Sequence, residues 1–310
     1  MKLSIYHSEV FKCLLYADID DIKVERQREL NYVKINRIGG NKMRCKRKGR
    51  MVMLGLLAIF LLIFSVWQTP VIAESEENLV GWWKLDGSER EGKPGEVKDA
   101  SGHGNDLTAE GWEDYPKTVP GVLGKAAQFD GKGQYLYAAP DRESLKVGDE
   151  SFTLMAWVKS DDLTARCGIL GMAVCDYAST CYGFYQREVP KGAPKFFFVV
   201  NGDPAIEKPF WNFIAASAQS GWHHLCGVRK WGEKLRLYVD GKLVAEGGKG
   251  AINPDKKGEY FLIGAAFHDK DGPTGFFNGL IDDVRLYKGT ALSPEQIKAI
   301  YMESRKVFDL

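Results

Sequence analysis

Near the C-terminus the chain reads Phe277-Asn278-Gly279-Leu280-Ile281-Asp282-Asp283-Val284-Arg285-Leu286-Tyr287, followed closely by Ser293-Pro294-Glu295-Gln296-Ile297. The first run predicts a β-strand over residues 280–287 that carries two adjacent carboxylates, because aliphatic and aromatic residues dominate it. The second run predicts a helix capped by Ser293, since Gln296 completes a capping box and Pro294 suits the first helical position. Ile297, Ile300 and Tyr301 share one face of that helix, which we expect to pack onto a sheet.

Turn signals divide the preceding sequence into short strand-like runs. These signals are Asp86-Gly87, Ser101-Gly102, Asp130-Gly131, Asn201-Gly202, Asp240-Gly241 and Asn278-Gly279. The runs between them predict strands at 82–85, 126–129, 152–158, 168–172, 182–185, 195–200, 222–229, 235–239 and 260–264. In the clearest hairpin, the alternating residues 235–239 meet residues 242–245 through Asp240-Gly241, which suits a two-residue type I′ turn. The fold class is therefore all-β.

Several segments, taken in order, resemble the laminin-G-like (concanavalin A-like lectin/glucanase) jelly-roll family. They are residues 80–86, 99–106, 124–131, 151–158 with Trp157, 222–224 and 281–285. The resemblance covers residues 79–303. It implies a two-sheet antiparallel jelly-roll sandwich with a short C-terminal helix, and it points to a binding module.

The first quarter of the chain resembles an export signal. The uncharged residues 51–67 follow the basic stretch Lys42–Arg50 and precede Val71-Ile72-Ala73. This order predicts a signal peptide over residues 43–73, cleaved after Ala73. The alternative is an uncleaved signal anchor that crosses a membrane through residues 51–72. Residues 1–42 are then a start-site extension, because Met43 stands where a signal peptide would begin. In either case we expect the domain to be extracellular or at the cell surface.

The net charge of +1 hides an uneven distribution. Residues 1–73 hold 13 Lys and Arg and 6 Asp and Glu; subtraction from totals of 42 and 41 leaves 29 and 35 in residues 74–310. The exported part is therefore acidic. Nucleic acid is not an expected partner, since phosphate binding needs a basic face.

Four of the six cysteines follow the signal: Cys167, Cys175, Cys181 and Cys226. In an oxidising compartment they predict two disulfides. Because Cys175 and Cys181 bracket a short loop, we expect them to pair, which leaves Cys167 for Cys226. Zinc is the alternative, although the segment has no Cys-x-x-Cys pair.

The resemblance also implies a structural Ca²⁺, because related jelly rolls hold one with an aspartate of the last long strand. The matching position is Asp282. Its expected neighbours are Asp86, Asp99, Ser101 and Asn105, since calcium takes six to eight oxygen ligands. The alternative is that these short polar side chains satisfy backbone amides at turns and strand ends.

Catalytic motifs are not evident. His223 and His224 are neighbours on an expected strand, so their side chains point to opposite faces and do not share one ion. Laminarinase-like relatives carry a Glu-x-Asp-x-Glu strand motif, which places two carboxylates about 5 Å apart for retaining hydrolysis. No Glu here has an Asp two positions later. We therefore expect no enzyme activity, with a glycan-processing enzyme on the same fold as the alternative.

Two segments, residues 167–181 and 210–213, match no pattern of this family. Aromatic residues in and beside these segments are the ligand-binding candidates. They are Tyr177, Tyr182, Trp211 and Phe213. Flat rings suit sugars, because they stack on apolar sugar C–H surfaces while polar groups read the hydroxyls. Core packing is the alternative role for each ring. The sequence predicts an exported module that binds a glycan or a surface protein, and an interaction domain without sugar affinity is the second reading.

Overall fold

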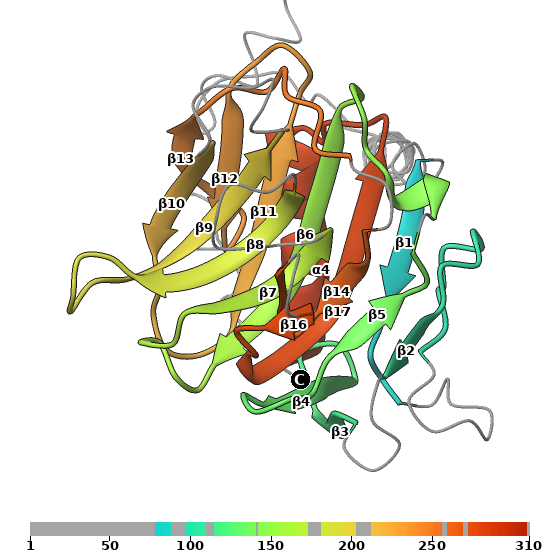
Figure 1. The fold of residues 1–310 in the computed structure, drawn as a ribbon, viewed down its shortest axis with the longest axis vertical. Helices are drawn as coiled ribbons and strands as arrows, with labels where there is room; N and C mark the ends of the chain where they lie inside the picture. The colour runs from blue at the N-terminus through green and yellow to red at the C-terminus, as the bar shows by residue number, and fades with distance from the viewer. Residues whose placement is uncertain are drawn as a thin grey trace, which may run out of the picture. The chain divides into compact units, whose positions relative to one another are not determined.

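The computed structural model describes residues 78–87, 97–109, 115–140, 142–172, 181–202, 212–255, 259–268 and 272–308. These residues form two large antiparallel sheets, one small two-stranded sheet and a C-terminal helix (Figure 1). The predicted signal segment 43–73 and residues 1–42 lie outside the described residues. Within the described ranges, no helix has the length and apolar character that a membrane span requires.

The first sheet has eight strands. Its order is β13 (Lys242–Gly247), β12 (Leu235–Val239), β11 (His223–Arg229), β6 (Phe152–Ser160), β17 (Asn278–Lys288), β4 (Lys125–Asp130) and β3 (Lys117–Pro120), and β1 (Leu79–Trp83) also pairs with β17. The last strand of the chain therefore lies in the interior of the sheet, between β6 and β4.

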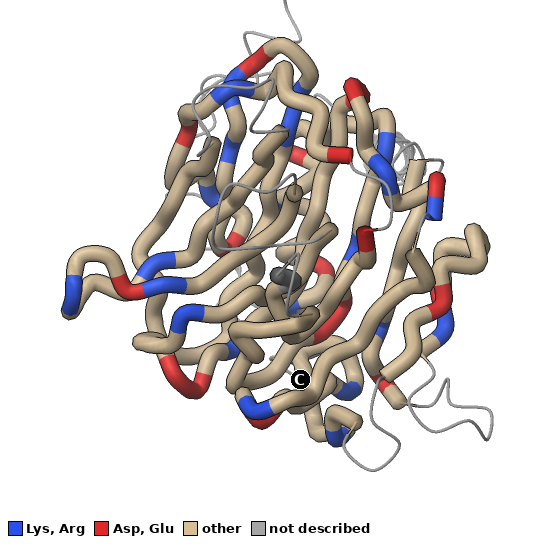
Figure 2. Tube along the Cα trace, viewed as in Figure 1, with Lys and Arg blue, Asp and Glu red and all other residues tan. Residues whose placement is uncertain are grey.

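The second sheet has seven strands. Its order is β10 (Phe213–Ser217), β9 (Pro194–Asn201), β8 (Cys181–Glu188), β7 (Cys167–Met172), β14 (Phe261–Ile263), β5 (Leu136–Ala138) and β2 (Leu107–Ala109). Strands β15 (Ala266–His268) and β16 (Gly272–Thr274) form the small sheet, and η3 (Glu143–Leu145) is a short 3₁₀ helix. Charged residues lie mostly at turns and strand ends (Figure 2).

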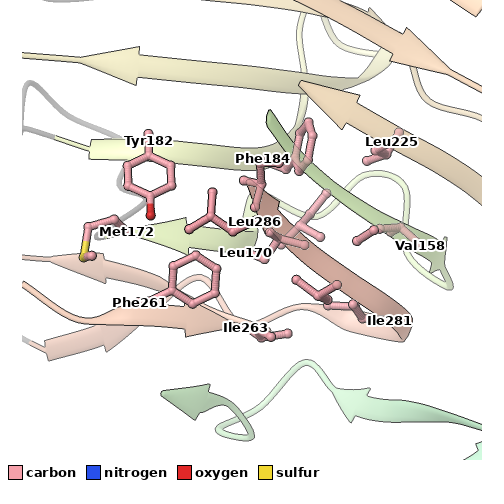
Figure 3. Packing of buried hydrophobic residues seen from close by; sticks show 14 of the residues in the cluster. Val158, Leu170, Met172, Tyr182, Phe184, Leu225, Phe261, Ile263, Ile281 and Leu286 are labelled. Carbon is pink, nitrogen blue, oxygen red and sulfur yellow. The ribbon is translucent and has the colours of Figure 1, made fainter. Parts of the chain in front are cut away.

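The main core fills the space between the two large sheets. Figure 3 shows part of it, with side chains from β6, β11 and β17 facing those from β7, β8 and β14. Trp83 is fully buried, and its ring stacks on Phe261 with 4.9 Å between ring centroids. The alternating apolar positions of each strand supply this layer, as expected for a sandwich. The predicted all-β, two-sheet architecture is confirmed.

Helix α4 (Pro294–Phe308) covers the opposite face of the eight-stranded sheet (Figure 1). Ile297 and Ile300 are buried against Met155 and Cys226, so the predicted apolar face is confirmed. The capping box also forms: the Ser293 amide donates to Gln296 Oε1 at 2.8 Å, and the Gln296 amide donates to Ser293 Oγ at 3.3 Å.

The sequence predicts the 235–245 hairpin fully, whereas it predicts strand β17 without the irregularity in its register. The 235–245 hairpin is confirmed, with φ angles of 52° at Asp240 and 71° at Gly241 that suit its tight turn. In β17 the strand is also confirmed, but its register with β6 shifts between Asp282 and Arg285, where Asp283 has a φ of 48°. This β-bulge breaks the simple alternation of side chains around the two carboxylates.

Candidate functional site

The outer face of the seven-stranded sheet carries an apolar cluster of its own, separate from the main core. Buried Tyr185, Phe197 and Val199 form it, together with Cys181. Phe213 on the edge strand β10 lies beside them; its ring centroid is 5.3 Å from that of Phe197, and 42% of the residue is exposed. We call Tyr185, Phe197 and Phe213 the aromatic row.

Strand register explains why these rings meet. Tyr185 pairs with Phe197 across β8 and β9, and Phe213 pairs with Val199 across β10 and β9. Side chains two residues apart on a strand share a face, so all three rings project away from the core. Ala215 lies opposite Phe197 and adds little bulk. Among the described strands, none pairs with the other edge of β10 beside Phe213.

Three cations border the aromatic row. Arg187 on β8 lies directly opposite Lys195 on β9. Arg166, just before β7, donates from Nε to the Tyr185 hydroxyl at 2.9 Å. Figure 2 shows Lys and Arg positions side by side on these neighbouring strands. We call Arg166, Arg187 and Lys195 the cationic row.

The predicted ligand-binding aromatic residues lie in different environments. Phe213 is on the outer face, although it begins strand β10 rather than lying in a loop. The prediction for Tyr182 is wrong: its ring is fully buried in the core beside Phe261, and its hydroxyl donates to the Leu145 carbonyl at 2.5 Å (Figure 3). Side chains alternate between the two faces of β8. Because Cys181 and Tyr185 lie on its outer face, Tyr182 lies on the face toward the core. Tyr177 and Trp211 lie outside the described residues.

The predicted Cys167–Cys226 disulfide is also corrected by the structure. Both residues are buried free thiols. Cys167 lies in the core between the sheets, whereas Cys226 lies on the other side of the eight-stranded sheet beneath α4. A layer of β-structure separates them, and a disulfide needs Cα atoms within about 7 Å. Cys175 lies outside the described residues, so its pairing with Cys181 stays a prediction.

Three of the five predicted calcium ligands organise a loop instead. The Asp99 carboxylate accepts hydrogen bonds from the backbone amides of Trp82, Ser101 and Asn105 at 2.9 to 3.0 Å, and from the Ser101 hydroxyl at 2.8 Å. Asn105 Nδ2 donates to the Val80 carbonyl at 2.7 Å. These contacts match the alternative reading, in which short polar side chains satisfy turn amides.

The other two predicted ligands face a different loop, residues 121–125. Asp282 Oδ2 accepts from the amides of Val122 and Leu123 at 2.7 and 2.9 Å, and Asp86 Oδ1 accepts from the Lys125 amide at 2.7 Å. Asp282 Oδ1 is buried with no hydrogen-bond donor among the described residues. The pKa of Asp282 is raised to about 8, chiefly by burial and also by the Asp283 and Asp86 carboxylates, although the two amide hydrogen bonds oppose the shift.

The five residues do not converge on one closed calcium site. Within the described ranges, no group of three or more His, Cys, Asp or Glu is arranged to hold a metal. Of the five residues, Asp86 and Asp282 bind the same loop. Asp282 Oδ1, which has no hydrogen-bond donor among the described residues, is the atom that a cation would contact.

A surface pocket of about 320 Å³ lies next to this pair, between β1, β17 and α4. The Trp82 ring is held between Lys84 and Arg285, each with its charged end 4.7 Å from the ring centroid. Trp82 Nε1 donates to Asp283 Oδ1 at 2.7 Å, and Arg285 pairs with the same carboxylate. The polar lining groups thus largely bind one another.

The two histidines point to opposite faces, as their alternation predicts. His223 Nδ1 lies 2.9 Å from Asp240 Oδ2, and this hydrogen bond raises the pKa of His223. His224 is buried against Trp157 and Tyr301, with ring centroids 5.3 and 6.0 Å away. They tie the β12–β13 turn and helix α4 to the sheet, which are structural roles.

Sequence reasoning missed Tyr185, Phe197 and the cationic row. The run Lys195-Phe196-Phe197-Phe198-Val199-Val200 is apolar on both faces, so alternation carries no signal there. The opposition of Arg187 and Lys195 depends on strand register. The turn sequence Val189-Pro190-Lys191-Gly192-Ala193 between β8 and β9 was the signal that could have revealed it.

Comparison with known proteins places the fold. No curated protein matches the sequence. Botulinum neurotoxin type C, whose cell entry depends upon interaction with two ganglioside molecules, matches with TM-score 0.53 and 12% identity, over 75% of this chain and 53% of that chain. The binding domain of Paraclostridial mosquitocidal protein 1 matches with TM-score 0.50 and 13% identity, over 73% of this chain and 52% of that chain.

Domain 4 of an extracellular arabinanase from Geobacillus stearothermophilus, in complex with arabinotriose, has TM-score 0.49, 18% identity, and coverage of 72% of this chain and 98% of that chain. The chain spans about half the length of the two toxin structures. At their identities, the likeness to the two toxin structures shows a shared fold. The family model of the concanavalin A-like lectin/glucanases superfamily matches residues 130–298. Since that match covers more than half of the 310 residues, this chain belongs to the concanavalin A-like lectin/glucanase superfamily.

Proposed function

We propose that this protein is a non-catalytic module that binds carbohydrate on the outer face of strands β8, β9 and β10. The observation that carries the proposal is the aromatic row, in which exposed Phe213 packs against buried Phe197, which in turn lies beside buried Tyr185. Buried Phe197 supports the exposed Phe213 ring from one side, and an exposed aromatic face suits a sugar ring.

The relatives support a binding role. The botulinum neurotoxin type C that shares this fold interacts with gangliosides, which are sugar-bearing lipids. Export through residues 43–73 fits the proposal, because a surface glycan is met outside the cell. Such a module would work as a released protein or remain anchored through residues 51–72. A surface protein is the alternative ligand and glycan processing the alternative activity, and both are outcomes of the experiment below.

Replacing Phe213 with alanine should abolish or greatly weaken glycan binding, by about tenfold or more, because the exposed stacking surface is lost. The measurement is binding of the purified protein to a glycan array, with affinities from calorimetry for each hit. Leu243→Ala is the matched control, since Leu243 is 51% exposed on edge strand β13 of the other sheet.

Equal affinity of wild type and Phe213→Ala for the same glycan would place the sugar elsewhere. If the array gives no hits but a cell-surface protein is captured through Phe213, the protein-binding alternative replaces the sugar. Release of reducing ends from any array hit would replace the binding role with glycan processing.

Calcium at Asp282 stays a prediction with its own experiment. If an ion satisfies Asp282 Oδ1 beside Asp86, adding calcium should raise the melting temperature above that in chelator by several degrees, since ligands that bind the folded state stabilise it. Asp282→Asn should remove that difference. Ser101→Ala is the control, because Ser101 donates to Asp99 and should leave the calcium response unchanged. Identical melting curves for the wild type in calcium and in chelator would rule the ion out.

A further inference from the structure

We infer that the ligand of this face is an acidic polysaccharide, whose carboxylate or sulfate groups pair with the cationic row while one of its sugar rings stacks on Phe213, the exposed ring of the aromatic row. The inference rests on the proposed function and adds the charge of the ligand to it. Arg166, Arg187 and Lys195 lie around the aromatic row, where they can pair with the anionic groups of such a ligand.

The pairing of Arg187 with Lys195 is unfavourable by itself. The two residues are directly opposite each other on adjacent antiparallel strands, and like charges in that arrangement destabilise a sheet. Both side chains are half-buried, so water screens their repulsion less than at a fully exposed site. A bound anion between them would convert this repulsion into two attractive contacts.

The described carboxylates nearest in sequence are occupied by other donors. Glu188 Oε1 accepts from the Gly192 amide at 2.5 Å, within the β8–β9 turn. Asp162 Oδ1 accepts from the Thr164 amide and hydroxyl at 3.0 and 2.7 Å. Among the described residues, neither Arg187 nor Lys195 has an ion pair with a carboxylate.

The dimensions suit a chain of sugars rather than one ring. Phe213 lies opposite Val199, and Lys195 is four residues before Val199 on the same face of β9. At about 3.3 Å per residue the two ends of the site are about 13 Å apart. Ala215 and Ser217 are the outward residues of β10 along this path, and both have small side chains.

Residues 74–310 are acidic as a whole, so the cationic row differs in sign from the segment that carries it. Residues 74–310 hold 29 Lys and Arg against 35 Asp and Glu, after subtraction of the N-terminal 13 and 6 from 42 and 41. An acidic protein repels an acidic polymer in general, so binding would depend on a local cluster of cations. Such binding should fall steeply with ionic strength.

The experiment compares polygalacturonate with its carboxyl-reduced, neutral form, using the purified protein in calorimetry and affinity electrophoresis. Heparin serves as the sulfated probe. The variants are Arg187→Gln/Lys195→Gln and a control that removes the same charge elsewhere, Lys242→Gln/Lys298→Gln, on β13 and α4. A melting curve for each variant shows that it is folded.

We expect the wild type to bind polygalacturonate or heparin and to bind the neutral polymer about tenfold or more weakly. Arg187→Gln/Lys195→Gln should lose that preference, while Lys242→Gln/Lys298→Gln should keep it. Raising the salt to about 1 M, where the screening length is about 3 Å, should remove the preference as well.

Two results would overturn the inference while leaving the proposed function intact. One is Phe213-dependent binding of neutral glycans with no preference for acidic ones. The other is an equal loss of acidic binding in both charge variants, which would indicate attraction to net charge alone. Binding of no glycan by the wild type would overturn the inference together with the proposed function.

Discussion

Acidification from pH 7 to pH 4 should remove about 3 kcal/mol of the free energy of unfolding through His224 alone. The pKa of His224 is lowered from 6.5 to about 4, chiefly by burial and also by Arg285, against the opposing effect of Asp283 and Asp240. The unfolded state therefore binds more protons between these values, so stability falls as the pH falls from 6.5 to 4. Each pKa unit corresponds to about 1.4 kcal/mol.

The physical cause is the position of His224 beneath helix α4. Both ring nitrogens are buried without hydrogen-bond partners in the described structure, between Trp157 and Tyr301. Trp157 Nε1 also donates to Ser304 Oγ at 3.0 Å, so the same contact joins the helix to the sheet. The Asp283 and Asp240 carboxylates do not compensate the loss of water around a charged imidazolium here, and unfolding or release of the helix would hydrate it.

The measurement is urea unfolding of the wild type and of His224→Phe at several pH values. The difference between the two curves isolates His224, because both proteins share the other titrating groups. The pKa values of His223 and Asp282 are raised, so each stabilises the fold at lower pH and loses that contribution as the pH rises. If the difference between wild type and variant is constant from pH 4 to 7, His224 does not stay neutral in the folded protein.

The second large effect is expected on replacement of Arg229 by methionine, which should cost about 3 kcal/mol or more of the free energy of unfolding. Arg229 is fully buried, and its guanidinium lies 4.7 Å from the Phe152 ring centroid. It donates to the carbonyls of Val147, Gly148, Glu150 and Ile252. Methionine fills much of the volume but leaves these acceptors without donors, and each unsatisfied group is costly.

The unfolding midpoint in urea is the measurement, with Arg236→Met as the matched control. Arg236 forms two ion pairs of 2.9 Å with Glu233 and Glu246, and all three side chains are partly exposed. Exposed ion pairs contribute at most about 1 kcal/mol, so the control should change little. Equal destabilisation by the two substitutions would show that the buried carbonyl contacts of Arg229 add nothing beyond an ordinary surface pair.

Features encoded by neighbouring residues could be predicted from the sequence, and features encoded by strand register could not. Ser293 and Gln296 are three residues apart, and Asp240 and Gly241 are adjacent. The capping box and the hairpin turn could therefore be predicted from residues close together in the sequence. The Cys167–Cys226 pairing was wrong because sequence does not show that a sheet separates the two residues. Tyr182 was misplaced because strand β8 is apolar on both faces, and only phase distinguishes it from Tyr185.

The candidate site shows the same division. Phe213 was found by composition, since it is an aromatic residue in a segment that departs from the family pattern. Its neighbours Tyr185 and Phe197 become partners only when β8, β9 and β10 align. The calcium prediction joined residues by family order, whereas the structure separates Asp99, with its own amide donors, from Asp282.

The place of β17 in its sheet has a consequence for synthesis of the chain. This strand covers residues 278–288 of 310, yet it lies between β6 and β4 and also pairs with β1. When the ribosome has synthesised the chain only up to residue 277, the eight-stranded sheet still lacks the strand that lies between β6 and β4. Pairings so distant in sequence form slowly, and incomplete sheets expose strand edges that aggregate. A premature stop anywhere before residue 278 should therefore yield a misfolded product rather than a shortened binding domain.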